Sequence, residues 1–303
     1  MSENPIRTYA KNLQSSGKGK ATRLDAFPGV EVFFTEYCYR TLSFQHKDFP
    51  GMIQINYCLD GRMGWKMNDG VCIYLGAGDL SLHAMDCCSH SSITLPTDHY
   101  RGVTVSVDLA AFEKNPPALL SEAGIQAKAL ARKLCPEKKP FCLPANPEID
   151  GIFSVLCRFE KSVSVPYCKL KIQELFFYLD RLDPAKEKTL NEYYSSQVEL
   201  IKEIHDFLIQ NLDKRFTIEA LARRYPINAS SLKSVFKAVY GQPIASYMKE
   251  RRIRRAMELL RTTDDSVAAI AKSLSYENQG KFTKAFKDFT QTMPTEYRRQ
   301  RQT

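Results

Sequence analysis

A phrase in the last third of this chain is written twice, 50 positions apart. Residues 232–247 read LKSVFKAVYGQPIASY, and residues 282–297 read FTKAFKDFTQTMPTEY. Identical residues fall in register between the copies: Phe236 with Phe286, Lys237 with Lys287, and Tyr247 with Tyr297. An internal repeat of this kind indicates one small structural unit that is built twice.

Each phrase completes a unit of two helices joined by a short turn. Before each copy, apolar residues recur at the i, i+3, i+4, i+7 spacing of a helix. These residues are Ile218, Leu221, Ala222 and Tyr225, and then Val267, Ile270, Ala271 and Leu274. Thr217 and Ser266 are suited to cap the first helix of each unit, and Asn228 and Asn278 to cap the second. The sequence therefore predicts helix-turn-helix units over residues 217–240 and 266–289.

The second helix of each unit has an apolar face and a polar face. The residues expected inside are Leu232, Val235, Phe236 and Val239, and then Phe282, Ala285, Phe286 and Phe289. The residues expected outside are Ser230, Ser231, Lys233, Ser234 and Lys237, and then Gln279, Lys281, Thr283, Lys284 and Lys287. The outer set carries hydroxyl, amide and ammonium groups and no carboxylate. Such groups can donate to base edges and phosphates without repelling DNA.

Basic charge is confined to the same part of the chain. Residues 201–303 contain 20 Lys and Arg against 11 Asp and Glu, whereas residues 1–200 contain 23 of each. The net charge of +9 therefore belongs to the last third. One-sided positive charge favours double-stranded DNA as a partner, because neutralised phosphates release counterions. A basic solubilising face is the alternative that charge alone leaves open.

The stretch between the two units reads as one helix over residues 244–261. At a rise of about 1.5 Å per residue it spans about 27 Å. Successive major grooves on one face of DNA repeat about every 34 Å. A rigid spacer of that order can place two recognition helices in adjacent grooves.

This part of the chain closely resembles the C-terminal domain of the AraC/XylS family of bacterial transcription regulators. The matching residues are Ala222, Ser230, Leu232, Phe236, Lys237, Gly241, Tyr247, Arg252, Ala256 and Leu260, and then Ile270, Ala271, Phe282, Phe286, Lys287, Pro294, Tyr297 and Arg298. The resemblance covers roughly residues 200–300 and implies a regulator that binds promoter DNA. It also implies that Ser230, Lys233, Ser234, Gln279, Lys281 and Lys284 face bases, while Lys237 and Lys287 are better placed for phosphates.

Three positions depart from the family pattern. Ser275-Tyr276 stands where Gly-Phe is usual, Gln291 replaces a glycine before the terminal proline, and Arg251 replaces a commonly apolar residue. These changes are expected to adjust local turns or contacts without altering the fold.

The N-terminal half is strand-like from Phe27 to about Val107 and is punctuated by turns. Asp60-Gly61, within MIQINYCLDGRMGWKM, predicts a hairpin. Short strands at this spacing predict a small barrel or sandwich. Helical spacing follows over Tyr167–Leu182, where Ile172, Leu175, Phe176, Leu179 and Leu182 form an apolar stripe suited to core packing or to a homodimer.

This half also resembles, more loosely, the cupin-like sensor domain that many such regulators carry. Gly70, Gly76, Gly78 and Asp79 match the second cupin motif, with Gly76 in place of the usual proline. A metal-binding cupin would have a histidine at Ser81 and a His-x-His pair in the preceding motif, and this sequence has neither. The resemblance therefore implies a ligand-binding barrel without the metal.

A mixed cluster of His83, Cys87, Cys88 and His90 keeps a second interpretation open. Imidazole and thiolate groups at this spacing suit zinc, iron or a thiol sensor, whereas the alternative is a strand followed by incidental thiols. The rival function is a metal- or redox-sensing regulator, or a cupin-derived metalloenzyme with an appended DNA-binding domain. No catalytic triad, paired catalytic carboxylates or phosphate-binding glycine loop is found, so we expect neither an enzyme nor a cofactor.

These observations predict an α+β multidomain protein. A cupin-like barrel with a helical segment is expected over residues 1–185, a polar linker over 186–195, and an all-α double helix-turn-helix domain over 196–303. Tyr57, Trp65, Tyr74 and His83 are the candidate pocket residues for a small-molecule effector, although ordinary core packing is an equal alternative for each.

RNA polymerase is a further expected partner of such a regulator. The chain has no apolar stretch near the roughly 20 residues of a membrane span, and its first residues lack the apolar core of a signal peptide. Its nine cysteines are an odd number and all lie at or before Cys168. A cytoplasmic protein with reduced thiols is therefore expected.

Overall fold

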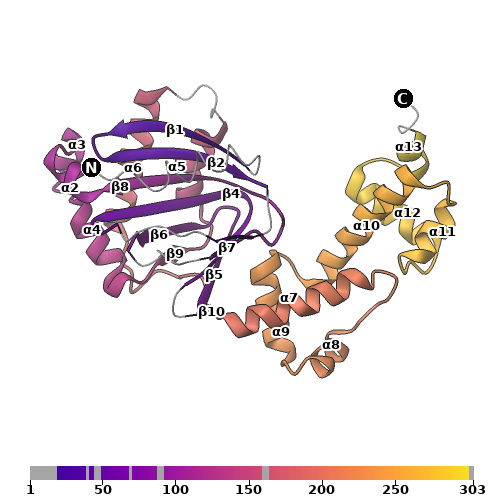
Figure 1. The fold of residues 1–303 in the computed structure, drawn as a ribbon. Coiled ribbons are helices and arrows are strands. Elements are labelled where there is room, and N and C mark those ends of the chain that lie inside the picture. Colours follow the sequence, from indigo (N-terminus) through magenta and orange to yellow (C-terminus); the bar gives the residue numbers. More distant parts are fainter. Residues whose placement is uncertain are drawn as a thin grey trace. The chain divides into compact units, whose positions relative to one another are not determined.

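The computed structural model describes residues 19–38, 41–43, 49–67, 70–86, 92–158 and 164–299 (Figure 1). The chain forms two compact units, Met1–Ser195 and Ser196–Thr303. The first unit combines antiparallel strands with helices, and the second is helical. The mixed α and β architecture predicted from the sequence is confirmed at this level.

The first unit contains two antiparallel sheets that share one long strand, β4 (Met52–Lys66). In the larger sheet the strands pair in the order β1 (Gly19–Phe27), β2 (Val30–Tyr37), β8 (Tyr100–Asp108), β4, β6 (Leu80–Ala84) and β9 (Phe141–Leu143). In the second sheet, the far end of β4 pairs on one side with β5 (Val71–Gly76) and on the other with β7 (Ser92–Thr94). Strand β10 (Tyr193–Tyr194) then pairs with β5, and β3 (Thr41–Ser43) with β7.

The hairpin predicted at Asp60-Gly61 is wrong. Residues 52–66 form a single strand, with a register shift between Cys58 and Asp60 and a positive φ of 79° at Gly61. A side chain at Gly61 would collide with the carbonyl oxygen of His99. The Asp-Gly pair therefore makes a β-bulge that redirects β4 from one sheet into the other, and it does not reverse the chain.

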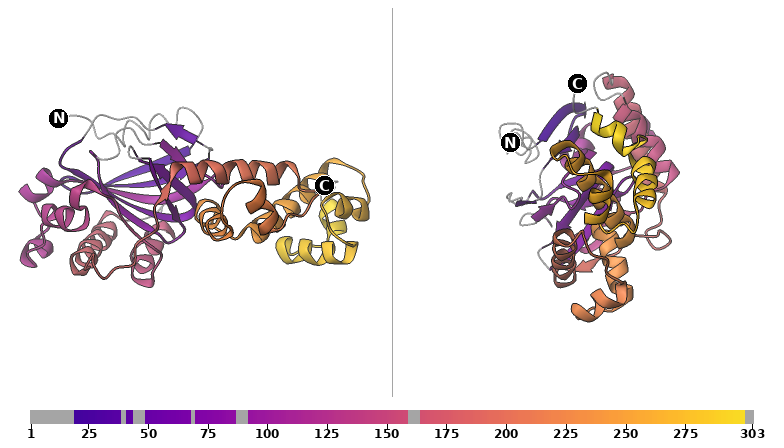
Figure 2. Two further views of the ribbon diagram at one scale, coloured as in Figure 1. Left: turned by 90° about the horizontal axis from the view of Figure 1, so that it is seen from below. Right: turned by 90° about the vertical axis from the view of Figure 1, so that its right-hand side faces the viewer.

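One face of the larger sheet is apolar and packs against helices. Opposite residues form continuous rows across β2, β8, β4 and β6: Val30, Val107, Ile53 and Ala84, then Val32, Val105, Ile55 and Leu82, then Phe34, Val103, Tyr57 and Leu80. Helices α5 (Pro147–Arg158) and α6 (Val165–Arg181) contact this sheet and lie together on one side of it (Figure 2). The shorter helices α2 (Leu109–Lys114), α3 (Ala118–Glu122) and α4 (Ala127–Leu134) add to the same core.

The apolar stripe of Tyr167–Leu182 is used inside this core. Ile172, Leu175, Phe176, Leu179 and Leu182 are all buried in it. The ring of Phe176 stacks on Phe112 of α2, with 4.9 Å between ring centroids. Of the two roles left open for the stripe, the structure therefore shows the packing role.

The end of the expected linker is part of the second sheet. Tyr193 and Tyr194 form β10, which pairs with Cys72 and Val71 of β5. The next amide, of Ser195, donates to the carbonyl oxygen of Gly70 at 2.8 Å. These residues are ordered by backbone hydrogen bonds despite their polar, charged surroundings in the sequence.

Over its described residues, 196–299, the second unit is built from seven helices. They are α7 (Ser195–Gln210), α8 (Ile218–Arg224), α9 (Ala229–Tyr240), α10 (Ile244–Thr262), α11 (Val267–Ser273), α12 (Gln279–Thr290) and α13 (Pro294–Arg299) (Figure 1). All four predicted N-caps form: Thr217, Asn228, Ser266 and Asn278 each accept a backbone amide three residues on. Each cap satisfies an amide that the first turn of a helix leaves without a partner.

The long helix α10 is common to both halves of this unit. Its residues Ile253, Ala256 and Leu260 are buried with the apolar side chains of α11 and α12. Near its start, the hydroxyl of Tyr247 contacts Nε2 of His205 at 2.9 Å, and the His205 ring stacks on Tyr240 of α9 at 4.3 Å. The two helix-turn-helix units are therefore joined through one continuous helix.

Two of the departures from the family pattern occupy left-handed backbone. Ser275 has a φ of 63° and Gln291 a φ of 59°, a region in which glycine is favoured because it lacks a Cβ atom. Gln291 ends α12 in the same way that Gly241, with a φ of 84°, ends α9. Both helix-turn-helix units therefore end in left-handed backbone, and the second does so at a residue that has a side chain.

This pair of helix ends gives a stability prediction. Gly241→Ala should lower the free energy of unfolding by about 1 kcal/mol, because alanine is strained at positive φ. Gln291→Ala is the matched control and should change the free energy of unfolding by only a few tenths of a kcal/mol, since glutamine at this position already has the strain of a positive φ. Urea unfolding followed by circular dichroism measures both. Equal losses in the two variants would contradict the strain argument.

Candidate nucleic-acid interface

The polar faces predicted for the two recognition helices lie on the surface. On α9, Ser230, Lys233, Ser234 and Lys237 are exposed and Ser231 is half-buried. On α12, Gln279, Lys281, Lys284 and Lys287 are exposed and Thr283 is half-buried. The two helices have the same length and the same type of N-cap. Each therefore presents a row of hydrogen-bond donors beginning in its first turn.

The inner faces hold these helices in place. Leu232, Val235, Phe236 and Val239 are buried, as are Phe282, Ala285 and Phe286. Phe289, predicted to point inward, is instead 40% exposed. The guanidinium of Arg254 on α10 lies 5.4 Å from the centre of its ring. Phe289 lies in the last turn of α12, where it packs under a cation at the surface and not in the core.

A carboxylate that the helix pattern missed lies beside the second recognition helix. Glu277, just before the Asn278 cap, forms an ion pair with Lys281. The hydrogen bond and charge of Lys281 lower the pKa of Glu277. Because both side chains are exposed, the ion pair is weak, and Lys281 can leave Glu277 to bind a phosphate or a base edge.

Two arginines hold the loop before α8, one by binding it from α10 and the other by linking it to the turn before α12. Arg252 on α10 donates from Nε to the carbonyl oxygen of Leu212 at 2.9 Å and from Nη2 to that of Lys214 at 2.7 Å. Arg215, in the loop before α8, donates from Nε to the carbonyl oxygen of Ser275 at 3.1 Å. Burial, and then the charge of Arg215, lower the pKa of Arg252. Within the C-terminal unit, these hydrogen bonds help to fix the second helix-turn-helix unit relative to the first.

The second face of the larger sheet in the N-terminal unit is polar and buried. Glu31, Ser106, Gln54 and His83 form one row of opposite residues across four strands, and Phe33, Thr104, Asn56 and Ser81 form the next. All eight residues are buried. Asn56 links two neighbours, because its Oδ1 accepts from Thr104 at 2.8 Å and its Nδ2 donates to Ser81 at 3.3 Å. Nε2 of Gln54 is sealed from solvent without a hydrogen-bond partner among the described residues.

The four candidate pocket residues do not form one cluster. The rings of Trp65 and His83 are 6.3 Å apart at the polar face, and Trp65 belongs to a small second core. Tyr74 is buried on β5, where its ring covers Gly64. Tyr57 lies on the opposite, helix-facing side, stacked on Phe153 at 4.6 Å and donating to Asp150 at 2.9 Å. The structure therefore brings Trp65 and His83 together and places Tyr57 apart from them.

The proposed metal cluster lies mostly outside the described residues, since Cys87, Cys88 and His90 belong to the segment 87–91. Ser81, at the position where a metal-binding cupin has histidine, is bonded to Asn56. Among the described residues, no group of three potential ligands is close enough to hold a metal ion.

Five of the described thiols are buried in the N-terminal unit: Cys58, Cys72, Cys135, Cys142 and Cys168. Burial raises the pKa of Cys58 strongly and that of Cys168 to about 11. The thiols of Cys58 and Cys168 are therefore protonated and poorly reactive at neutral pH. In the described part of the chain, no helix has the length and apolar character needed to cross a membrane.

Comparison with known proteins gives matches to the C-terminal unit. A family model described as a helix-turn-helix domain matches residues 221–300. The transcriptional activator AarP of Providencia stuartii is 31% identical over 102 residues, which are 34% of this chain and 76% of AarP. The activator RhaR of Mannheimia succiniciproducens is 32% identical over 108 residues, 36% of this chain. The chain spans only 39% of the length of RhaR.

A solved structure of ToxT from Vibrio cholerae covers 89% of this chain with 14% identity and a TM-score of 0.33. The family model falls on the part of the chain that carries the two helices α9 and α12. With more than three quarters of AarP covered at 31% identity, the chain belongs to the AraC/XylS family of transcription regulators.

Proposed function

We propose that this protein is a sequence-specific DNA-binding transcription regulator that responds to a small molecule bound in its N-terminal unit. The observation that supports the DNA-binding part is the pair of surface helices α9 and α12. Both are capped by asparagine and both are anchored on one connecting helix. Exposed ammonium groups lie on both, together with serine hydroxyls on α9 and the amide of Gln279 on α12.

The connecting helix suits two adjacent major grooves. Helix α10 has 19 residues. At about 1.5 Å per residue it is about 28 Å long, close to the roughly 34 Å between successive major grooves on one face of DNA. A helix of this length, with a recognition helix packed near each end, is a rigid spacer for two contacts on the same duplex.

Residue roles follow from position on each helix. Ser230, Lys233 and Ser234, with Gln279, Lys281 and Lys284, lie in the first two turns and are proposed to face bases. Ser231 and Thr283 flank them, and Lys237 and Lys287, in the last turns, are proposed to hold phosphates. The Ser234 hydroxyl donates to the carbonyl oxygen of Ser231, so toward DNA we expect it to act as an acceptor. RNA polymerase is the second proposed macromolecular partner, and transcription from a bound promoter with and without the protein tests this.

The polar sheet face supports the effector-binding part of the proposal. Buried polar groups are costly unless they are hydrogen-bonded, and the amide nitrogen of Gln54 has no partner among the described residues. We infer that the two sheets form a cupin-like barrel whose interior binds a small polar molecule. Gln54, His83 and Trp65 are its proposed contacts, and Tyr74 lies on the adjoining strand β5. Because the relatives are named as regulators, we propose no reaction for this site.

Lysine substitutions should separate base reading from phosphate binding. Lys284→Ala should cost about 1–3 kcal/mol at the preferred site and relax sequence preference at one base step. Lys287→Ala should weaken all sequences alike and reduce the slope of log K against log salt by about one unit. Fluorescence anisotropy on selected and random duplexes measures both, with Lys202→Ala on α7 as a control of equal charge. Identical effects of Lys284→Ala and Lys287→Ala on random DNA would remove the base-reading assignment.

Effector binding should depend on the polar face and not on the apolar one. A metabolite that raises the melting temperature of the full chain should lose this effect in Gln54→Leu and His83→Phe, because a ligand bound only by the folded state stabilises it. Tyr57→Phe is the matched control, since it changes a hydroxyl on the other face of the same strand β4. A ligand whose shift survives in the first two variants and disappears in Tyr57→Phe would show that the pocket is misplaced.

Self-association is proposed through the outer side of α6. Its stripe is buried, but Val165 and Leu170 on the same helix are 43% and 60% exposed. We expect the full chain to sediment as a dimer, the commonest soluble assembly, and Leu170→Glu to make it monomeric. A wild-type chain that stays monomeric at all concentrations, or a dimer unaffected by Leu170→Glu, would refute this interface.

A further inference from the structure

A cavity of about 470 Å³ lies within the C-terminal unit, away from the exposed faces of α9 and α12. Its wall comes from three places: the end of α7 with the loop before α8 and the start of α8, the first half of α10, and Tyr276 in the turn before α12. The volume is within the range of pockets that bind small molecules. The cavity therefore touches both helix-turn-helix units and the helix that joins them.

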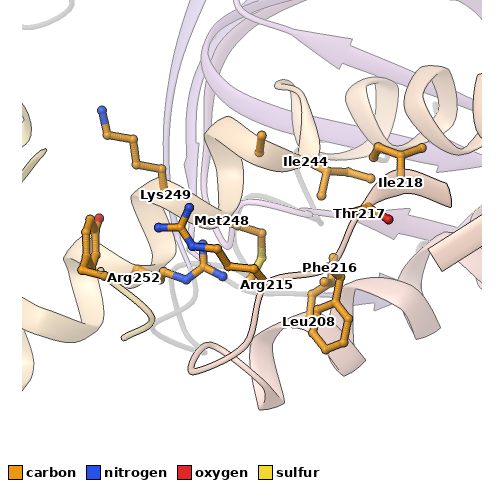
Figure 3. A pocket seen from close by; sticks show the side chains of 11 residues that line it. Leu208, Arg215, Phe216, Thr217, Ile218, Ile244, Met248, Lys249 and Arg252 are labelled. Atoms are coloured by element: carbon orange, nitrogen blue, oxygen red, sulfur yellow. The ribbon is translucent and has the colours of Figure 1, made fainter. Parts of the chain in front are cut away.

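One end of this cavity is cationic. Arg215, Lys249 and Arg252 lie near one another at that end (Figure 3). None of the 11 lining residues is acidic. The two guanidinium groups are near enough for the charge of Arg215 to lower the pKa of Arg252. An anion between these groups would relieve their mutual repulsion.

The cationic groups are already positioned by the protein. Backbone carbonyl oxygens accept from Nε and Nη2 of Arg252 and from Nε of Arg215. Nη1 of Arg252 and both terminal nitrogens of Arg215 take part in none of these hydrogen bonds, so these atoms are available for a ligand. The hydroxyl of Tyr276 is sealed from solvent and has no hydrogen-bond partner among the described residues, so turning it toward an anion breaks no existing bond. Donors that are held in place in advance lose little entropy on binding.

The other end of the cavity is apolar. Leu208, Phe216, Ile218 and Ile244 line it, and Met248 lies between the two ends (Figure 3). Leu208, Ile244 and Met248 are buried in the core, whereas Phe216 and Ile218 are half-buried. The shape thus offers donors for a charged head and an apolar wall for a short hydrocarbon body.

We propose that this cavity binds a small amphipathic anion, a carboxylate or phosphate monoester with an apolar tail. The head contacts Arg215, Lys249 and Arg252, and the tail lies against Leu208, Phe216 and Ile244. This site is separate from the proposed effector pocket in the N-terminal unit. A DNA phosphodiester would supply the same negative charge but nothing for the apolar end, which is why a free molecule is favoured.

The test uses the full chain and named probes. Isothermal titration calorimetry with hexyl phosphate and hexanoate should give saturable binding. Inorganic phosphate, hexanol and hexyltrimethylammonium are the matched probes that lack the tail, the charge or the correct sign of charge. Each should bind at least about tenfold more weakly, because head and tail both contribute. No DNA is present, so failure here leaves the proposed DNA-binding function untouched.

Two variants locate the binding. Arg215→Gln should lower the affinity for hexyl phosphate by about tenfold or more, because it removes a charged donor. Ala245→Trp fills the cavity while keeping every cation, and Ala245 is exposed in the first turn of α10, so the core is not disturbed. Lys272→Gln removes one charge outside the cavity and should bind like the wild type.

Hexyl phosphate binding that is equal in the wild type, Arg215→Gln and Ala245→Trp would place the ligand elsewhere and overturn the proposal. No saturable binding of either anionic probe would also overturn it. If neither anionic probe bound and Arg215→Gln also had reduced affinity for random double-stranded DNA, we would conclude that these cationic side chains bind DNA phosphates.

Discussion

The C-terminal unit depends on α10 being buried at both of its ends. The first half of the C-terminal unit buries Ile244, Tyr247 and Met248 from the start of this helix. The second half buries Ile253, Ala256 and Leu260 from the rest of it. Burying each large apolar side chain stabilises the fold by about 1.5–3 kcal/mol, so neither half is complete without this helix. The two recognition helices therefore have a fixed spacing because they share a piece of core, and not because a loop happens to have a suitable length.

The loops beside α10 reinforce this constraint with charged side chains. Arg252 and Arg215 donate to three backbone carbonyl oxygens that the loops would otherwise leave to water. Hydrogen bonds from charged donors are stronger than those between neutral groups, and here they hold irregular backbone between helices. The same two side chains form the cationic end of the cavity, so a bridge between loops and a candidate anion site are built from one set of groups.

Local features of the sequence predicted local structure well. The four N-caps, the two helix-turn-helix units and the buried sides of α9 and most of α12 depend on residues within one or two turns of each other. Asp60-Gly61 failed because its outcome depends on His99, far along the chain, whose carbonyl oxygen fits only beside a glycine. The polar rows through Gln54 and Asn56 were also out of reach, since strand register decides which residues face one another. Glu277 was missed because it precedes the helix whose face it joins.

The placement of the cysteines makes the N-terminal unit separately observable. Its buried thiols, such as Cys58 and Cys142, can react with a labelling reagent only when the structure around them opens, while the sequence after Cys168 contains no thiol. Cys38 is exposed and reacts without opening, so the labelling rates of the buried thiols, followed one by one, measure the free energy of local opening in that unit alone. Labelling each thiol with and without DNA would then show, residue by residue, whether occupancy of one unit changes the opening of the other.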